Sequence, residues 1–309
     1  MKISICIVNK NSEATIEKSL RSVLSQIDET YEVVIVDESS DKSRDIINSL
    51  IEEYPELIKP IYLAKEEMGN IGQARNRSIT EASGEYCIMH IDCDDIWEPH
   101  IKDFVAVFLQ IEKLFSKNFL LAGQQINMAR RDFLLSVGSY QPIEHGEDRD
   151  LWMRLAKRNQ YMPIDHVVFF RRLPLTTKVN KMKAIKRTFW SVRDEIRAGR
   201  KFLDLVFDFF QSDHPHSRKI RAIKILCFAI AKPTSRGMSK FDQKLYFNHS
   251  DEWNSYKRGH TGTYSNIAKV WGFSGSLDFL ENSLSRSIFS HGRSDRFYEE
   301  LLREDGLKE

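Results

Sequence analysis

The first 174 residues alternate short runs of β-branched side chains with segments of helical periodicity, and this alternation most constrains the possible fold. The candidate strands are residues 3–8, 32–37, 60–63 and 86–92. Between the first two, apolar side chains recur at helical spacing from Ile16 to Leu24, with Ser12 as the expected N-cap. This pattern predicts an α/β fold with a mostly parallel sheet and helices packed on its faces.

The charge of the chain divides it into three parts. Residues 1–174 carry 21 Lys and Arg against 28 Asp and Glu, a net charge of −7. Residues 175–232 carry 14 against 5, a net charge of +9, and residues 233–309 carry 11 of each. We therefore predict an α/β domain over 1–174 and a mainly helical C-terminal region over 175–309, basic in its first part and neutral in its second. The basic part calls for a polyanionic partner or surface.

Composition limits the compartment and the class of protein. The four cysteines form no C-x-x-C pair and no metal-ligand spacing, which indicates buried free thiols and a reducing compartment. The first residues show no cleavage pattern, and no apolar stretch approaches the roughly 20 residues that cross a bilayer. We expect a cytoplasmic protein, with peripheral attachment to the inner face of the membrane left open. The acidic first domain and the lack of a recognition motif argue against a nucleic-acid partner.

Three carboxylates, Asp92, Asp94 and Asp95, follow the fourth candidate strand within four positions. Like charges this close repel each other, so a cation is their natural neutraliser. Carboxylate oxygens on a tight turn suit Mn²⁺ or Mg²⁺, whose other positions are filled by water and phosphates. The alternative is a solvated acidic strand end. We expect Asp95 to cap the helix that begins near Pro99, which leaves Asp92 and Asp94 for the metal.

A second carboxylate cluster, Glu147 with Asp148 and Asp150, stands at the start of an amphipathic helix that turns Leu151 and Leu155 inward. A helix N-terminus favours ionised carboxylates, so helix capping is one interpretation. The other is a general base, because a rigid mount that keeps the carboxylate charged suits proton removal from a hydroxyl.

Taken together in order and spacing, five stretches resemble the GT-A glycosyltransferase family 2, a group of inverting nucleotide-sugar enzymes. They are residues 3–11, 33–40, 69–76, 82–95 and the segment of Glu147 and Asp148. The resemblance implies a GT-A, Rossmann-like domain, a nucleotide-sugar donor, a glycan or lipid-linked acceptor, and Mn²⁺ or Mg²⁺ as cofactor.

The resemblance also implies roles for individual residues. It assigns the donor to Val8, Asn9, Asp37, Arg75, Asp92 and Cys93. It assigns the metal to Asp94 and Asp92, the acceptor to Glu147, and the role of general base to Asp148. An arginine at position 75 could instead pair with carboxylates across the site. A UDP-sugar is the expected donor.

Two further functions stay open on the sequence. A catalytically inactive sugar-nucleotide-binding or scaffold protein would lose the base or the metal ligand, yet Asp94 and Asp148 are both present. A sugar nucleotidylyltransferase would need a glycine-rich, basic loop after the first strand, and residues 8–12 contain no glycine. The basic helices of 183–232 have two interpretations, docking on the acidic domain or contact with an anionic membrane surface. A homo-oligomer is also left open.

Overall fold

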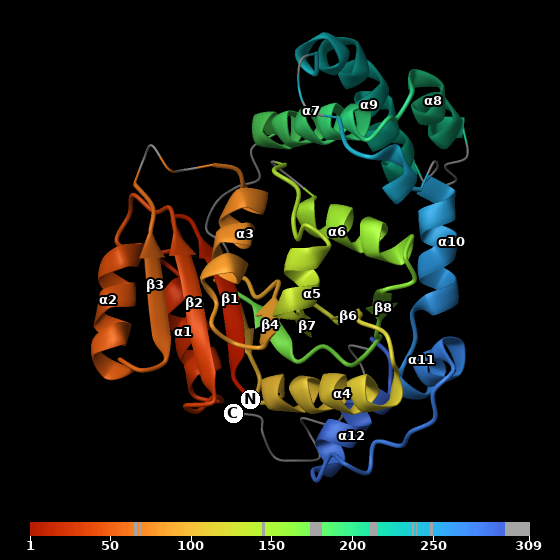
Figure 1. Cartoon of the computed structure of the whole chain (residues 1–309). Helices are drawn as coiled ribbons and strands as arrows, with labels where there is room; N and C mark the ends of the chain where they lie inside the picture. Colours follow the sequence, from red (N-terminus) through yellow and green to blue (C-terminus); the bar gives the residue numbers. More distant parts are fainter. Residues whose placement is uncertain are drawn as a thin grey trace.

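The computed structural model describes residues 1–64, 67, 69–143, 146–173, 181–210, 215–236, 238, 240–247 and 250–293. Within these residues, one seven-stranded sheet has the order β3-β2-β1-β4-β7-β6-β8 (Figure 1). Its strands are β1 (Ile3–Asn9), β2 (Tyr31–Asp37), β3 (Ile58–Tyr62), β4 (Tyr86–Met89), β6 (Leu120–Ala122), β7 (Asn127–Arg130) and β8 (Tyr161–Pro163). A two-stranded antiparallel ribbon joins β5 (Asp95–Trp97) to β9 (Phe170–Arg172).

The sheet is mostly parallel, as predicted. The pairs β1–β2, β1–β4, β2–β3 and β6–β8 are parallel, whereas β7 runs antiparallel to both β4 and β6. All seven residues of β2 are buried, which fits a strand covered by helices on both faces. The predicted strand 60–63 begins earlier, at Ile58. The strand predicted over 86–92 ends earlier, at Met89, because His90 takes a positive φ of 71° that breaks the extended backbone.

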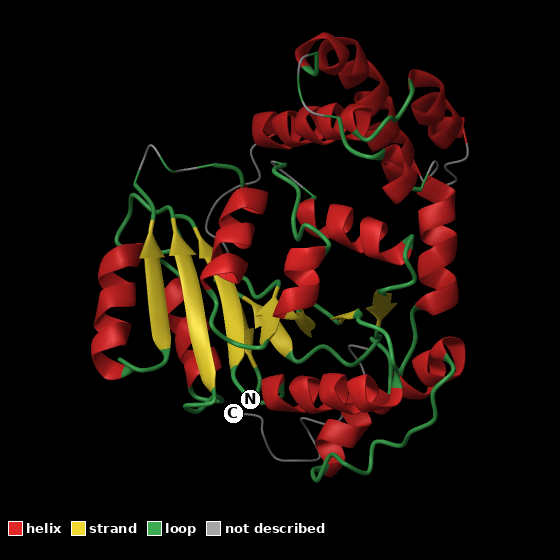
Figure 2. Ribbon diagram, viewed as in Figure 1, coloured by secondary structure: helices red, strands yellow, loops and turns green. Residues whose placement is uncertain are grey.

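Helices flank the sheet in the ribbon diagram (Figure 2). The first six are α1 (Ile16–Leu24), α2 (Ser43–Glu53), α3 (Ile71–Glu81), α4 (Ile101–Leu114), α5 (Arg131–Ser136) and α6 (Glu147–Ala156). The predicted N-cap of α1 is wrong, because the cap residue is Thr15; the Ser12 carbonyl instead accepts the backbone N–H groups of Thr15 and Ile16. Asn70 and Gln73 form a reciprocal capping box that fixes the start of α3.

The predicted helical C-terminal region is confirmed. It contains α7 (Lys181–Arg197), α8 (Phe202–Phe210), α9 (Pro215–Thr234), a 3₁₀ turn at Gln243–Leu245, α10 (Ser250–His260), α11 (Tyr264–Trp271) and α12 (Ser283–Ser290). In Figure 1, α7, α8 and α9 gather at one end of the molecule above α6, whereas α10 to α12 descend toward α4. Val192 and Phe228 belong to a small core of their own, separate from the core beneath the sheet.

The end of the chain returns to the main core. Tyr264, Ile267 and Phe289 are buried in the same hydrophobic cluster as Phe104 of α4 and the strands β1 and β2. In the structure, α11 and α12 thus contribute side chains to the core of residues 1–174. The division of the chain at residue 174 stays a prediction. None of the described helices is long and apolar enough to cross a membrane.

Candidate active site

Parallel pairing brings the ends of β1 and β2 together, with Asn9 in register beside Asp37. The Asn9 amide donates to Asp37 Oδ1 at 2.7 Å, and the Ser39 hydroxyl donates to the same oxygen at 2.6 Å. Arg44 Nε donates to Asp37 Oδ2 at 2.8 Å. The Asp37 side chain is fully buried, so these partners fix it at the floor of the site. Its contact with a donor stays a prediction.

The acidic turn after β4 brings three carboxylates together. One oxygen of each of Asp92, Asp94 and Asp95 lies within 4.8 Å of the others. Asp95 is wholly buried in β5, where Arg172 Nε and Nη2 donate to its two oxygens at 3.0 and 3.1 Å. The expectation that Asp95 caps the following helix is therefore wrong, since Arg172 uses its carboxylate and α4 begins after His100.

The other two carboxylates of this turn remain partly open to solvent. The side chains of Asp92 and Asp94 are 34% and 22% exposed. Partial burial raises the pKa of each, and neighbouring carboxylates add to the shift. Two partly exposed carboxylates with crowded negative charge match the oxygen donors that Mn²⁺ and Mg²⁺ prefer, so these residues fit the predicted metal.

Cys93, between the two aspartates, is buried, and its side chain lies against the end of β1. Its thiol lies 4.0 Å from the carbonyl oxygen of Val8, which is partly buried in β1. Burial raises the pKa of the Cys93 thiol well above its ordinary value. This burial favours packing at the end of β1 over a role as metal ligand, and the predicted contact of Cys93 with the donor stays a prediction.

Arg172, like His90, belongs to this site but was not predicted from the sequence. Its guanidinium lies 3.5 Å from Asp92 Oδ2 and 3.8 Å from Asp94 Oδ2, besides its contacts with Asp95. The ribbon formed by β5 and β9 brings it there from 77 positions along the chain. In the sequence, Arg172 is only the second of two arginines that follow the apolar run 167–170. This pattern does not indicate that Arg172 pairs with Asp95.

Arg75 on α3 joins the acidic turn to α6. Its Nε donates to Glu147 Oε1 at 3.0 Å, while Nη2 lies 3.4 Å from Asp148 Oδ2 and 3.8 Å from Asp92 Oδ1. Burial opposes its charge, but these three carboxylates outweigh that effect and raise the pKa of Arg75. The ion pairs that the sequence left open are present, and they place the two predicted carboxylate clusters around one guanidinium.

The start of α6 presents two different carboxylates. Gly146, with a φ of 80°, turns the chain into the helix. Burial and the neighbouring Asp148 raise the pKa of Glu147 to about 7, despite its ion pair with Arg75. Asp148 Oδ2 also lies 3.3 Å from His90 Nε2. Asp148 is 15% exposed, against 6% for Glu147, and is the more accessible of the two. Leu151 and Leu155 are fully buried, as predicted.

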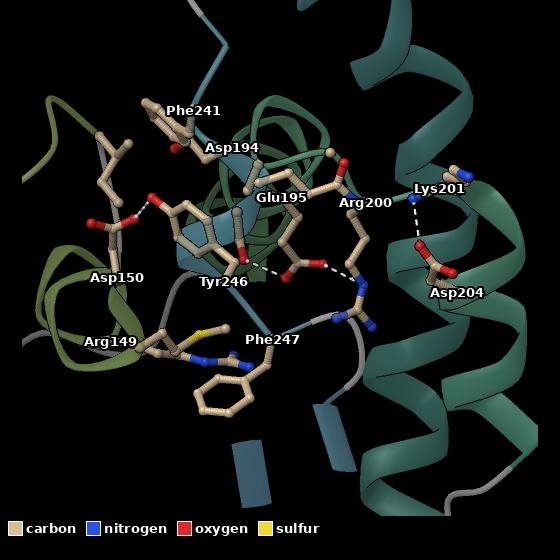
Figure 3. A pocket seen from close by; sticks show the side chains of 17 residues that line it. Arg149, Asp150, Asp194, Glu195, Arg200, Lys201, Asp204, Phe241, Tyr246 and Phe247 are labelled. Carbon is tan, nitrogen blue, oxygen red and sulfur yellow. Dashed lines mark hydrogen bonds and ion pairs between the residues drawn. The ribbon is translucent and has the colours of Figure 1, made fainter. Parts of the chain in front are cut away.

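A cavity of about 480 Å³ lies beside α6 (Figure 3). Arg149 and Asp150 line it from α6, Glu195 from α7, and Tyr246 and Phe247 from the segment before α10. The Tyr246 hydroxyl donates to Asp150 Oδ1 at 2.5 Å, which ties this segment to α6. The sequence alone does not predict this cavity, because its walls come from three separate parts of the chain.

The first part of the chain resembles known proteins. Residues 4–120 match the family model described as glycosyl transferase family 2. This segment is a glycosyl transferase family 2 domain. The resemblance predicted from the sequence is thus confirmed for the segment that carries Asn9, Asp37, Arg75 and the acidic turn. The carboxylates of α6 lie outside the matched residues.

The proteins that resemble the chain include two curated relatives and one solved structure. An uncharacterized glycosyltransferase of Nostoc sp. is 41% identical over 110 residues, covering 35% of this chain and 33% of the relative. The UDP-Glc:α-D-GlcNAc-diphosphoundecaprenol β-1,3-glucosyltransferase WfaP of Escherichia coli is 33% identical over 130 residues, covering 39% and 49%. A mannosyltransferase of Pyrobaculum calidifontis, solved with GDP-Man and Mn²⁺, superposes with a TM-score of 0.49 at 12% identity, covering 94% of this chain and 86% of that one. The chain thus spans about a third to a half of the length of these two curated relatives.

Proposed function

We propose that the chain is a glycosyltransferase that moves a sugar from a nucleotide-sugar donor, a UDP-sugar, to an acceptor hydroxyl with inversion at the anomeric carbon. The observation that carries this proposal is the cluster around Arg75. One guanidinium contacts Asp92 of the acidic turn and Asp148 of α6. A site for a donor diphosphate and a candidate base therefore border the same space.

The residues of the site divide the reaction between them. Asp94 and Asp92 would hold Mn²⁺ or Mg²⁺, which when bound stabilises negative charge on the departing diphosphate. Val8, Asn9, Asp37 and Cys93 would line the nucleoside side, and Arg75 would add positive charge near the phosphates. Asp148 would remove the proton from the incoming hydroxyl, because Arg75 and His90 hold its Oδ2 and orient the carboxylate. Glu147 would bind the acceptor beside it.

The acceptor is proposed to be a glycan or a lipid-linked sugar. The name of the Escherichia coli relative gives a UDP-sugar donor and a lipid diphosphate acceptor, which supports this choice. The cavity behind α6 supports an acceptor longer than one sugar, because Arg149, Tyr246 and Phe247 offer hydrogen-bonding groups and aromatic faces next to the base helix. Attachment to the inner face of an anionic membrane through residues 183–232 would bring the enzyme close to such an acceptor.

Release of nucleoside diphosphate from UDP-, GDP- and dTDP-sugars with Mn²⁺ tests this function. Asp94→Ala removes a metal ligand and should abolish release, whereas Asp148→Asn keeps the shape but not the base and should lower transfer by about 10²- to 10⁴-fold. Asp45→Ala, an exposed aspartate on α2, is the matched control and should retain full activity.

Other outcomes would favour the other functions. Tight nucleotide-sugar binding without turnover, in the presence of vesicles and glycan acceptors, would indicate an inactive sugar-nucleotide-binding protein. Formation of a nucleotide sugar from a nucleoside triphosphate and a sugar phosphate would indicate a nucleotidylyltransferase. If no nucleotide sugar bound with or without metal, the transferase proposal would be wrong.

A further inference from the structure

The outward face of α9 is apolar, which is unusual for a surface helix. Ile220, Ile223, Leu226 and Ile230 are 41%, 38%, 73% and 64% exposed. Their spacing of three and four residues places them on one face of the helix. At 1.5 Å per residue, this face extends over about 15 Å. A stripe of this length costs free energy in water and indicates an interaction site.

The inward face of α9 is already packed. Cys227, Phe228 and Ala231 are buried in the small core shared with Val192 of α7 and Leu205 of α8. The helix is therefore apolar on two sides, and its packing on α7 uses only one of them. Docking of the basic helices on the acidic domain, one of the two interpretations of the sequence, leaves this second side unexplained.

The neighbouring helix α8 carries a similar exposed face. The ring of Phe202 lies tilted against that of Phe228 of α9, with centroids 5.5 Å apart, so the two helices are in contact. Leu203 and Phe210 are both 73% exposed, and Phe207 is 48% exposed. Aromatic side chains on the surface of a helix favour the interface between water and lipid.

Basic residues stand at both ends of the α9 stripe. Arg218 and Lys219 lie at its start and Lys232 and Arg236 at its end, and all four are exposed. From residue 200 to residue 236 the sequence has eight Lys and Arg against three Asp and no Glu. This positive charge complements an anionic headgroup layer. An acidic protein is less suited to this surface, because its carboxylates would be buried against the isoleucine and leucine side chains of the stripe.

We propose that the exposed faces of α8 and α9 bind the surface of an anionic lipid bilayer. The apolar side chains would enter the boundary between headgroups and acyl chains, and the lysines and arginines would contact the phosphates. The helices would lie in the plane of the interface, since none of the described helices can span a membrane. Binding there would place the enzyme where a lipid-linked acceptor lies, and this last point alone rests on the proposed function.

Co-sedimentation of the full chain with extruded vesicles tests the proposal. We expect binding to phosphatidylglycerol–phosphatidylcholine vesicles and at least about tenfold weaker binding to pure phosphatidylcholine or at high salt. The double variant Leu226→Ser with Ile230→Ser should lose at least about tenfold in binding. Leu135→Ser with Val270→Ser, two exposed apolar residues elsewhere, is the matched control and should bind like the unmodified chain.

The readouts separate this proposal from the proposed function. Donor hydrolysis and the thermal midpoint should be equal in the α9 variant and its control, because the changed residues are exposed and outside the active site. The membrane proposal is overturned if the unmodified chain stays in the supernatant, or if the two double variants bind vesicles equally. A dimer seen by light scattering that the α9 variant dissolves would show instead that a second copy covers this face.

Discussion

The role of Arg172 depends on contacts that only the folded protein provides. It pairs with both oxygens of the buried Asp95 and extends its positive charge toward Asp92 and Asp94. If Asp92 and Asp94 hold a divalent ion as proposed, a guanidinium 3.5 to 3.8 Å from their carboxylates competes electrostatically with that ion. The same arginine also prevents Asp95 from being a buried, unpaired charge.

Replacement of this arginine should separate the two effects. Arg172→Gln should tighten Mn²⁺ binding by about five- to tenfold, because it removes roughly 1 kcal/mol of repulsion between the guanidinium and the bound ion. It should also lower the thermal midpoint, because Asp95 loses its partner. Free Mn²⁺ can be titrated by electron paramagnetic resonance, which needs no donor. Arg172→Lys keeps the charge and is the control, with Mn²⁺ affinity near that of the unmodified chain; unchanged or weaker binding in Arg172→Gln would contradict this role.

At the scale of the element, α6 separates two spaces. Glu147 and Asp148 contact Arg75. Arg149 and Asp150, the next two residues of the helix, line the cavity (Figure 3). Both sets stand within one helical turn of Gly146, so the cavity is within about 10 Å of the candidate base. We propose that an acceptor held at Asp148 extends past the start of the helix into this cavity.

A change on the cavity side of α6 should affect the acceptor and spare the donor. Arg149→Ala should raise the KM for an acceptor of two or more sugars by about tenfold, the effect of one lost charged hydrogen bond. The KM for the donor and the rate of donor hydrolysis should not change. Arg158→Ala, an exposed arginine just beyond α6, is the matched control. Equal acceptor KM values for the two variants would show that the cavity does not bind the acceptor.

At the scale of the whole molecule, the C-terminal helices complete the core of the N-terminal sheet. Phe289 of α12 is fully buried, with its ring near those of Phe104 and Phe169. The family 2 segment alone ends at residue 120, so it lacks the helices that cover this part of the core.

The stability of the chain should therefore depend on its last described helix. Phe289→Ala should lower the free energy of unfolding by about 3–5 kcal/mol, the usual cost of removing a buried phenylalanine. Phe210→Ala, at a side chain 73% exposed, should change it by less than about 0.5 kcal/mol. Urea unfolding followed by circular dichroism measures both. A small effect of Phe289→Ala would show that α12 only lies on the surface of the core.

The sequence predicted what depends on local pattern. Alternating strand and helix periodicity is a property of neighbouring residues, and it located β1, β2, α1 and the helical C-terminal region. The acidic turn and the carboxylates of α6 were likewise found, because each is a compact group of charged residues whose repulsion calls for a partner. The order of the motifs then predicted the family, which the match over residues 4–120 confirmed.

The tertiary structure alone decided which distant groups meet. The pairing of Arg172 with Asp95 spans 77 positions, and it changed the expected role of Asp95 from helix cap to ion-pair partner. The meeting of Arg75 with Asp148 and the cavity behind α6 depend in the same way on chain segments brought together by packing. The same holds for the outward face of α9, since the sequence shows that this helix is apolar but not which of its sides is buried. Contacts between distant segments are set by how helices and strands fill the core, and no local pattern records that.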